Sequence, residues 1–384
     1  MLIKKCLISF IISLLFLSGC AAIKATPVRE LRHRPEPRKG DDLPSIPCCK
    51  RDIQITYFGA SGFLIERGKF AVLTAPFFSN PGLAEITGPI HPNVDLIENG
   101  LKGFSLTNVK AILVGHAHYD HLMDVPYVVK KIKAPAPKVY GSETMKNILL
   151  NLNKESRERE ISAEREEVFT TNDDNIVALN KKAAAFWTPG EWVCFNREGG
   201  TNCNASDVLF RFMAIMSEHA PHFAGRKFFS GVVDPDEEPA TTGGDWKEGQ
   251  TLTYVMDFLG PGKTVDLRIH FQDATSNPPA GFLPVFEPKD RTDRVDIAIV
   301  CVAGYGEVNN YPEGIIHNLN PRHVILSHWE NFFKPLPKNP EELEVVPGTN
   351  VDAFIGRLER VLPSDAGWTF PNPGTVISFD PKKN

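Results

Sequence analysis

Three histidines and an aspartate fall within one short segment of this sequence. The segment Gly115-His116-Ala117-His118-Tyr119-Asp120-His121 directly follows a short apolar run, residues 109–114, which is typical of a buried strand. Packed together, protonated imidazoles would repel one another, so a cation that takes up their lone pairs is the natural resolution. Histidine nitrogen and carboxylate oxygen are ligands that zinc prefers. We therefore expect a metal centre at the end of this strand.

Further metal-ligating side chains follow later strands. Period-two alternation and short apolar runs predict strands at residues 53–57, 63–65, 70–73, 209–215, 252–258, 265–271, 295–302 and 323–326. After three of these come His219 and His222, then Asp273, then His328. Helical spacing predicts helices at residues 144–152, 312–318 and 351–361. Alternating strands and helices indicate a layered α/β architecture.

The HxHxDH pattern, with further ligands in this order, resembles the metallo-β-lactamase superfamily. The resemblance covers about residues 52 to 332 and implies a four-layer αββα sandwich. Within the superfamily, the chain is most similar to lactonases and phospholipase D-like enzymes, such as ascorbate-phosphate lactonase and N-acylphosphatidylethanolamine-hydrolysing phospholipase D. The similarity rests on the run Tyr57–Ile65, the turn Pro76-Phe77-Phe78, His222-Phe223-x-x-Arg226 and His328-Trp329-x-x-Phe332.

The resemblance implies a set of metal ligands. It assigns His116, His118 and His222 to one ion, Asp120, His121 and His328 to a second ion, and Asp273 to a bridging position. The His-Phe-x-x-Arg pattern favours His222 over His219 as the ligand. His219 would then contact a ligand or the substrate, or it is itself the ligand in place of His222. Relatives often carry an aspartate near Ala75, where this chain has only a methyl group.

The implied activity is that of a binuclear, metal-dependent hydrolase. Two divalent ions, zinc by default with manganese or iron also compatible, would share a hydroxide that acts as nucleophile. Asp120 would orient this hydroxide and take part in proton transfer. Because Asp273 stands where some β-lactamases use cysteine, we expect a phosphodiester, lactone or amide substrate. The alternatives are a non-catalytic envelope binding protein with the same fold and a mononuclear iron oxygenase.

The N-terminus has the pattern of an export signal. Lys4 and Lys5 precede an apolar run, Leu7–Leu17, which is shorter than the roughly 20 residues that span a bilayer. The following Leu17-Ser18-Gly19-Cys20 resembles the bacterial lipobox, which implies removal of residues 1–19 and lipidation of Cys20. We therefore expect an exported protein, lipid-anchored to the cell envelope. Ala21 after the cysteine favours the outer membrane in a diderm cell.

One hydrolase domain is expected beyond a tether. Residues 20–50 combine several prolines with basic residues, which is typical of an extended spacer. At roughly 150 residues per domain, a chain of 384 residues would suggest two or three domains. The candidate ligands, however, spread from His116 to His328, so that one site draws on both halves of the chain. Residues 51–384 are therefore predicted to form a single domain.

Cysteines and net charge add two expectations. Cys194 and Cys203 flank a Gly- and Asn-rich stretch, and in an oxidising compartment they are candidates for a disulfide. Cys301 lies in an apolar run and is expected to be a buried thiol, whereas Cys48 and Cys49 are not assigned. With 42 Lys and Arg against 47 Asp and Glu, the net charge of −5 argues against nucleic-acid binding. The expected partners are a small-molecule or lipid substrate and, through Cys20, a membrane.

Overall fold

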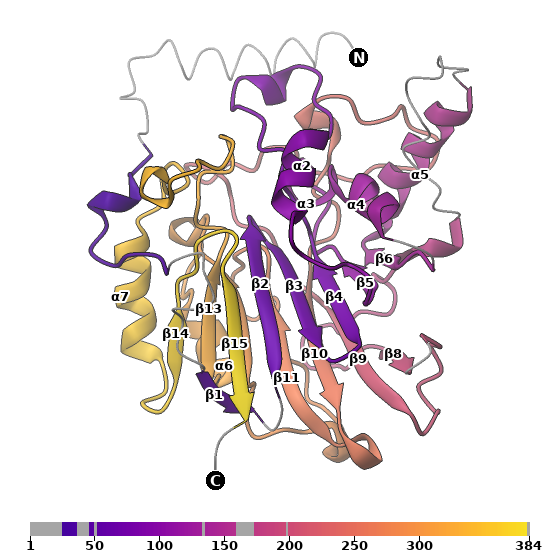
Figure 1. The fold of residues 1–384 in the computed structure, drawn as a ribbon, viewed down its shortest axis with the longest axis vertical. Coiled ribbons are helices and arrows are strands. Elements are labelled where there is room, and N and C mark those ends of the chain that lie inside the picture. The colour runs from indigo at the N-terminus through magenta and orange to yellow at the C-terminus, as the bar shows by residue number, and fades with distance from the viewer. Residues whose placement is uncertain are drawn as a thin grey trace.

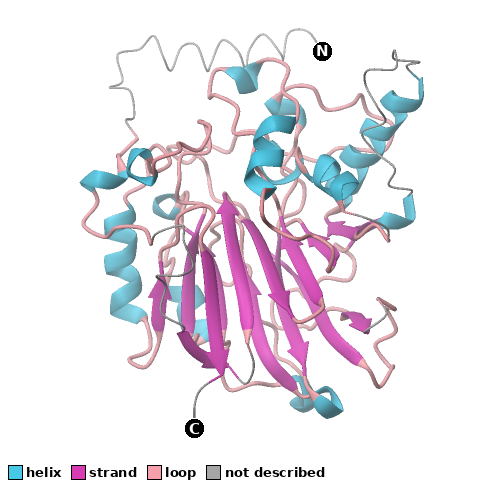
Figure 2. Cartoon of the chain, viewed as in Figure 1, coloured by secondary structure: helices cyan, strands magenta, loops and turns pink. Residues whose placement is uncertain are grey.

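The computed structural model describes residues 25–36, 46–49, 52–132, 135–158, 173–196 and 199–381. Within this part of the chain, two mixed β-sheets face each other and helices lie outside them (Figures 1 and 2). The first sheet has the strand order β1-β15-β2-β3-β4-β5-β6-β7, and the second has the order β14-β13-β12-β11-β10-β9-β8. This is the predicted αββα metallo-β-lactamase sandwich.

The first sheet is built mainly from the N-terminal half of the chain. Its strands are β1 (Ile46–Cys49), β2 (Ile53–Gly59), β3 (Gly62–Arg67), β4 (Phe70–Thr74), β5 (Val109–Leu113), β6 (Lys138–Gly141), β7 (Ile176–Ala178) and β15 (Val376–Pro381). Every residue of β4 is buried. A strand that is buried on both faces must be covered on both sides, here by the second sheet and by helices.

The second sheet comes from the C-terminal half. Its strands are β8 (Val193–Asn196), β9 (Val208–Met216), β10 (Leu252–Leu259), β11 (Val265–Phe271), β12 (Ile297–Cys301), β13 (His323–Ser327) and β14 (Gly367–Thr369). Phe63 of β3 meets Phe271 of β11 edge to face, with 6.3 Å between ring centroids. Phe70 of β4 contacts Phe210 of β9 at 4.6 Å. Aromatic side chains therefore fill the core between the two sheets.

The helices follow the strands that they cover. They are α2 (Val94–Leu101), α3 (Tyr119–Leu122), α4 (Val125–Lys131), α5 (Glu143–Glu158), α6 (Glu313–Leu319) and α7 (Val351–Val361). The predicted helices correspond to α5, α6 and α7, whereas α2 and α4 were not predicted. No helix in the described ranges is long and apolar enough to cross a membrane.

Two parts of the predicted tether are integrated into the domain. Val28, in a short 3-10 helix, is 5% exposed and donates its backbone N–H to the carbonyl of Leu343. The carboxylate of Asp352 accepts from the backbone N–H groups of Arg32 and His33. Strand β1 pairs in parallel with β15. The remaining tether, the signal sequence and Cys20 lie outside the described residues, so those expectations stay predictions.

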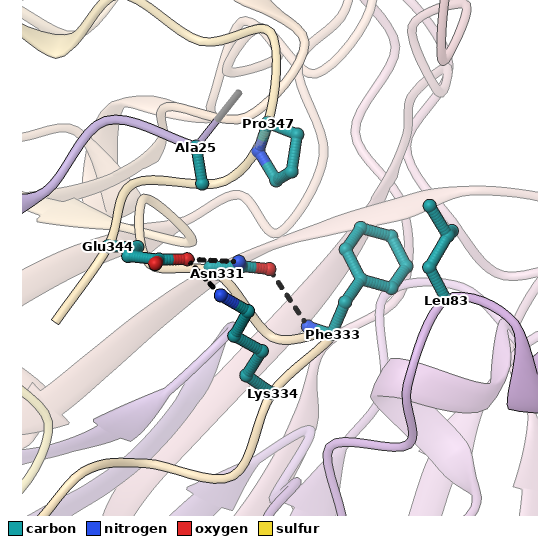
Figure 3. Close-up of a pocket in the computed structure, with 7 residues that line it drawn as sticks. All are labelled: Ala25, Leu83, Asn331, Phe333, Lys334, Glu344 and Pro347. Atoms are coloured by element: carbon teal, nitrogen blue, oxygen red, sulfur yellow. Dashed lines mark hydrogen bonds and ion pairs between the residues drawn. The ribbon is translucent and has the colours of Figure 1, made fainter. Parts of the chain in front are cut away.

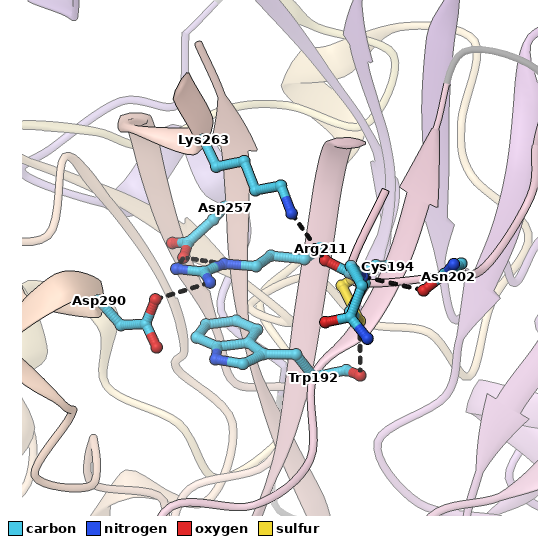
Figure 4. Close-up of a disulfide and its surroundings, with 9 residues drawn as sticks. Trp192, Cys194, Asn202, Arg211, Asp257, Lys263 and Asp290 are labelled. Atoms are coloured by element: carbon cyan, nitrogen blue, oxygen red, sulfur yellow. Dashed lines mark hydrogen bonds and ion pairs between the residues drawn. A yellow bond between two sulfur atoms is a disulfide. The ribbon is translucent and has the colours of Figure 1, made fainter. Parts of the chain in front are cut away.

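Cys194 and Cys203 form the predicted disulfide, with sulfur atoms 2.10 Å apart. It lies at the edge of the second sheet, next to an ion-pair network (Figure 4). There Arg211 stacks over the Trp192 ring at 3.9 Å and donates to Asp257 at 3.0 Å. Cys301 is the buried thiol that the sequence predicted.

Candidate metal centre

The HxHxDH segment occupies the loop between β5 and the short helix α3. His118 stands just before the first turn of α3, and Asp120 and His121 lie within that turn. The other candidate ligands follow strands of the second sheet: His219 and His222 after β9, Asp273 after β11 and His328 after β13. Four strand ends from two sheets therefore meet at one edge of the sandwich.

The structure groups these side chains into three clusters of possible ligand atoms. They are His116 with His118 and His219; His116 with His121 and Asp273; and Asp120 with His121 and His328. Within each cluster the ligand atoms lie within 4.8 Å of one another. The first and third clusters share no residue, and the second connects them. The three clusters therefore form one continuous array, and the cluster that contains Asp273 stands between the other two.

Asp273 occupies that intermediate position. One carboxylate oxygen lies 3.3 Å from Nδ1 of His116, and the other lies 3.5 Å from Nδ1 of His121. The backbone N–H of Gly115 donates to the carboxylate at 3.0 Å. A Cβ atom on Gly115 would lie 2.2 Å from both carboxylate oxygens. Glycine is therefore required before His116 because the Asp273 carboxylate fills the space of a side chain.

His219 joins His116 and His118 in the first cluster, whereas the His-Phe-x-x-Arg pattern favours His222. Nδ1 of His219 lies 2.6 Å from the carbonyl oxygen of Ala220, so it must carry the proton, and the lone pair is left on Nε2. Nδ1 of His222 instead accepts the backbone N–H of Phe228 at 3.1 Å. In neutral His222 the proton is then on Nε2, and no ring nitrogen has a free lone pair for a metal.

Residues 57–195, which include the HxHxDH segment, match the family model described as Metallo-beta-lactamase superfamily. The two-sheet fold and the ordered ligands agree with this match. Over these residues the chain is similar to the metallo-β-lactamase superfamily. The match supports a metal-dependent hydrolase, the enzyme class predicted from the sequence.

Solved structures that are similar to this chain have little sequence in common with it. Igni18, a metallo hydrolase of the archaeon Ignicoccus hospitalis, is 14% identical, with 85% of this chain and 98% of that chain covered and a TM-score of 0.43. YhfI, a metallo-β-lactamase fold protein of Bacillus subtilis, is 12% identical, with 84% of this chain and 98% of that chain covered and a TM-score of 0.42. CmlA, a diiron β-hydroxylase of Streptomyces venezuelae, is 10% identical, with 88% of this chain and 55% of that chain covered and a TM-score of 0.41. No curated protein matches the sequence.

Burial and mutual repulsion keep the imidazoles of the first cluster neutral. Burial, followed by the neighbouring charges, holds the pKa of His116, His118 and His219 well below the usual value. Protonation and metal binding compete for the same lone pairs. These three side chains therefore have lone pairs available at neutral pH without displacing a proton.

The third cluster, Asp120 with His121 and His328, has the opposite charge pattern. Burial acts to raise the pKa of Asp120, but His121 and His328 outweigh it and hold that pKa well below the usual range. Burial acts to lower the pKa of His121, but Asp120 and Asp273 outweigh it and raise the pKa. Burial raises the pKa of Asp273. Asp120 thus supplies negative charge to this half of the centre, and a cation beside Asp273 would offset the effect of burial on that carboxylate.

The donor set fits divalent metal ions. Several buried ring nitrogens have no hydrogen-bond partner among the described residues: Nε2 of His116 and His118, both nitrogens of His121, and Nδ1 of His328. Buried polar atoms are normally paired, and such a concentration of unpaired ones indicates a site that an ion completes. Imidazole and carboxylate suit zinc, manganese and iron alike, so the identity of the metal stays a prediction.

Two groups that support the candidate ligands were not predicted from the sequence. Asp124, wholly buried, accepts from the backbone N–H groups of Phe78 and Ser79 and from the Ser79 hydroxyl at 2.6 Å. It thereby fixes the loop after β4, close to Ala75, where relatives often carry an aspartate. Tyr57 and Glu330 form a second support. Both lie inside the sequence motifs that carry the family resemblance, but only the fold brings the two side chains together.

A pocket of about 490 Å³ is lined in part by residues that follow His328 in the sequence (Figure 3). It is lined by Ala25, Leu83, Asn331, Phe333, Lys334, Glu344 and Pro347. The ring of Phe332 lies 4.8 Å from that of His328 and 4.3 Å from that of Phe333. Adjacent aromatic rings thus connect a candidate ligand to the pocket wall.

Proposed function

We propose that the chain is a binuclear metallohydrolase. The observation that carries this proposal is the position of Asp273, whose two oxygens face histidines of different clusters. His116, His118 and His219 would hold one ion, and Asp120, His121 and His328 the other, with Asp273 between them. Two divalent ions bound here would activate a water molecule at neutral pH and polarise a carbonyl or phosphoryl oxygen.

Asp120 is the proposed catalytic residue. Its carboxylate lies 3.4 Å from Nε2 of His121 and 3.3 Å from Nε2 of His328. Because these histidines keep its pKa low, Asp120 stays an acceptor at neutral pH. A carboxylate oxygen at this position can orient an attacking water molecule and accept its proton.

The substrate classes proposed are phosphodiesters, lactones and amides. The pocket beside the centre combines the apolar side chains of Leu83, Phe333 and Pro347 with the polar side chains of Asn331 and Lys334. Such a wall suits a substrate with an apolar part and a polar part.

We also propose that the chain is exported and anchored through a lipid on Cys20. The disulfide between Cys194 and Cys203 supports an oxidising compartment. Ala25 lines the pocket, and five residues of extended chain span at most about 18 Å. An anchor on Cys20 would therefore keep the pocket near the membrane surface, where lipid substrates are found.

Metal analysis of the purified protein, paired with a substrate screen, tests the function. We expect two ions per chain and hydrolysis of bis(p-nitrophenyl) phosphate, a lactone or a phospholipid. His118→Ala and Asp120→Ala should abolish turnover. Metal content near zero, or turnover unchanged by both substitutions, would overturn the proposal. Iron with oxygen-dependent turnover would favour an oxygenase instead.

Fractionation of cells tests the anchor. The wild-type chain should sediment with membranes, and Cys20→Ser should not be lipidated. If phospholipids are substrates, Cys20→Ser should lose activity on vesicles but keep activity on soluble bis(p-nitrophenyl) phosphate. Equal activity of wild type and Cys20→Ser on vesicles would show that the anchor is not needed for hydrolysis of vesicle lipids.

A further inference from the structure

The backbone of His328 adopts an unusual conformation. Its φ of 54° lies in the left-handed region, which side-chain-bearing residues rarely adopt without support from neighbours. Its backbone N–H donates to the hydroxyl of Tyr57 at 2.9 Å, and its carbonyl accepts from the N–H of Ala303 at 3.2 Å. Both polar backbone groups of this candidate ligand are therefore fixed by other parts of the fold.

Tyr57 is itself held by a buried carboxylate. Its hydroxyl donates to Glu330 at 2.5 Å, and the backbone N–H of Ala60 donates to the other oxygen of Glu330. The tyrosine is fully buried and Glu330 is 1% exposed. Since the hydroxyl proton is directed to Glu330, an oxygen lone pair is left for the N–H of His328. Glu330 therefore sets the direction of the hydrogen bond that supports His328.

The turn between β2 and β3 is shaped around this carboxylate. Gly59 has a φ of 111°, and a Cβ atom there would lie 3.1 Å from Glu330 Oε1. In the same turn, the hydroxyl of Ser61 donates to the carbonyl oxygen of Asp273 at 3.3 Å. Through Tyr57 of β2 and Ser61 of the turn, one hairpin thus contacts the backbone of two candidate ligands that follow different strands of the opposite sheet.

We propose that Tyr57 and Glu330 are positioning residues for the second ion, the one assigned to Asp120, His121 and His328. They fix the backbone of His328, and with it the direction of the imidazole. In the described part of the chain, the side-chain hydrogen bonds of Tyr57 and Glu330 go to His328, Ala60 and each other, and none goes to His116, His118 or His219. The inference rests on the proposed two-ion function and adds a selective effect on one of the two ions.

Titration of the metal-free, full-length protein with cobalt(II), followed by visible absorption and competition with a chelator, tests the inference. Wild type should bind two ions. Tyr57→Phe removes only the hydroxyl and should weaken one binding event by 10- to 100-fold, the range typical for loss of a group that orients a ligand. The other event should be unchanged. Glu330→Gln should weaken the same event less, because Tyr57 can still accept from His328.

Tyr305→Phe is the matched control, because that hydroxyl donates to the Asn350 carbonyl instead. It should leave both affinities unchanged. Unchanged affinities in Tyr57→Phe would overturn the inference, as would an equal loss at both positions. Retained binding of the first ion also shows that a variant is folded. If wild type binds fewer than two ions, the proposed function fails, whatever the variants do.

Discussion

His219 and His222 stack on each other with ring centroids 4.7 Å apart, yet their hydrogen bonds require opposite tautomers. His219 donates from Nδ1 to the carbonyl of Ala220, whereas Nδ1 of His222 accepts from Phe228. Only His219 therefore presents a lone pair on Nε2. Two histidines three positions apart are thereby divided between different roles.

This division predicts different effects of removing each ring. His219→Ala should lower the affinity for one ion by at least 100-fold, because a ligand is lost. His222→Ala should keep both ions, with any loss confined to substrate turnover. Metal content after dialysis against a weak chelator distinguishes the two variants. Loss of an ion in His222→Ala, with retention in His219→Ala, would restore the ligand set drawn from the sequence.

The glycine before the first histidine gives a second prediction. In Gly115→Ala the new methyl group would collide with the Asp273 carboxylate and displace it from between the two clusters. We expect a fall in turnover of about 100-fold and weaker binding of at least one ion. Gly306→Ala is the control, because a Cβ there meets no atom within 4 Å. Equal activity of the two variants would argue against a bridging role for Asp273.

The sequence predicted the fold, and most of the residues that the structure gathers into the candidate centre, because both depend on local patterns. The strands that were predicted are long or strongly apolar, such as β5, β10 and β12. The short strands β6, β7 and β14 have too few residues to show a period, and pairing within the sheet determines them. The HxHxDH ligands were found because they are adjacent in the sequence.

The groups that escaped prediction act through distant contacts. Tyr57 and Glu330 are 273 positions apart in the chain, and nothing local indicates that they meet. The choice between His219 and His222 depended on the donor at Phe228, which is set by a turn. The family pattern favours His222 while the hydrogen bonds favour His219, because the pattern carries residue types and spacing but no tautomers.

The disulfide gives a prediction about stability alone. Cys194 and Cys203 are nine positions apart, and closing a loop of this length stabilises a fold by about 2–3 kcal/mol in the chain-entropy model. The double variant Cys194→Ser, Cys203→Ser should lower the free energy of unfolding by about this amount. Metal content should not change, because the bridge lies at the far end of β9 from His219. Urea unfolding measures the first quantity and metal analysis the second. A loss of metal in this variant would show that the sheet edge and the centre are coupled.

A buried histidine outside the centre predicts an acid-sensitive fold. His270 is fully buried, its Nε2 donates to the carbonyl of Gly281 at 2.9 Å, and burial lowers its pKa to about 4. The unfolded chain would titrate near 6.5, so it binds the proton first as the pH falls. The stabilising contribution is therefore complete above pH 6.5 and is lost between pH 6.5 and about 4, by roughly 3 kcal/mol in total.

Replacing His270 tests this directly, because His270→Gln keeps a donor for Gly281 and removes the titration. The free energy of unfolding, measured in urea from pH 7.5 to 4.5 with the metal removed, should fall less steeply with acid in the variant. His317→Gln is the matched control, since His317 is an exposed residue on α6 and should not alter the slope. Parallel pH profiles for wild type and His270→Gln would mean that His270 is protonated in the folded protein as readily as in the unfolded chain.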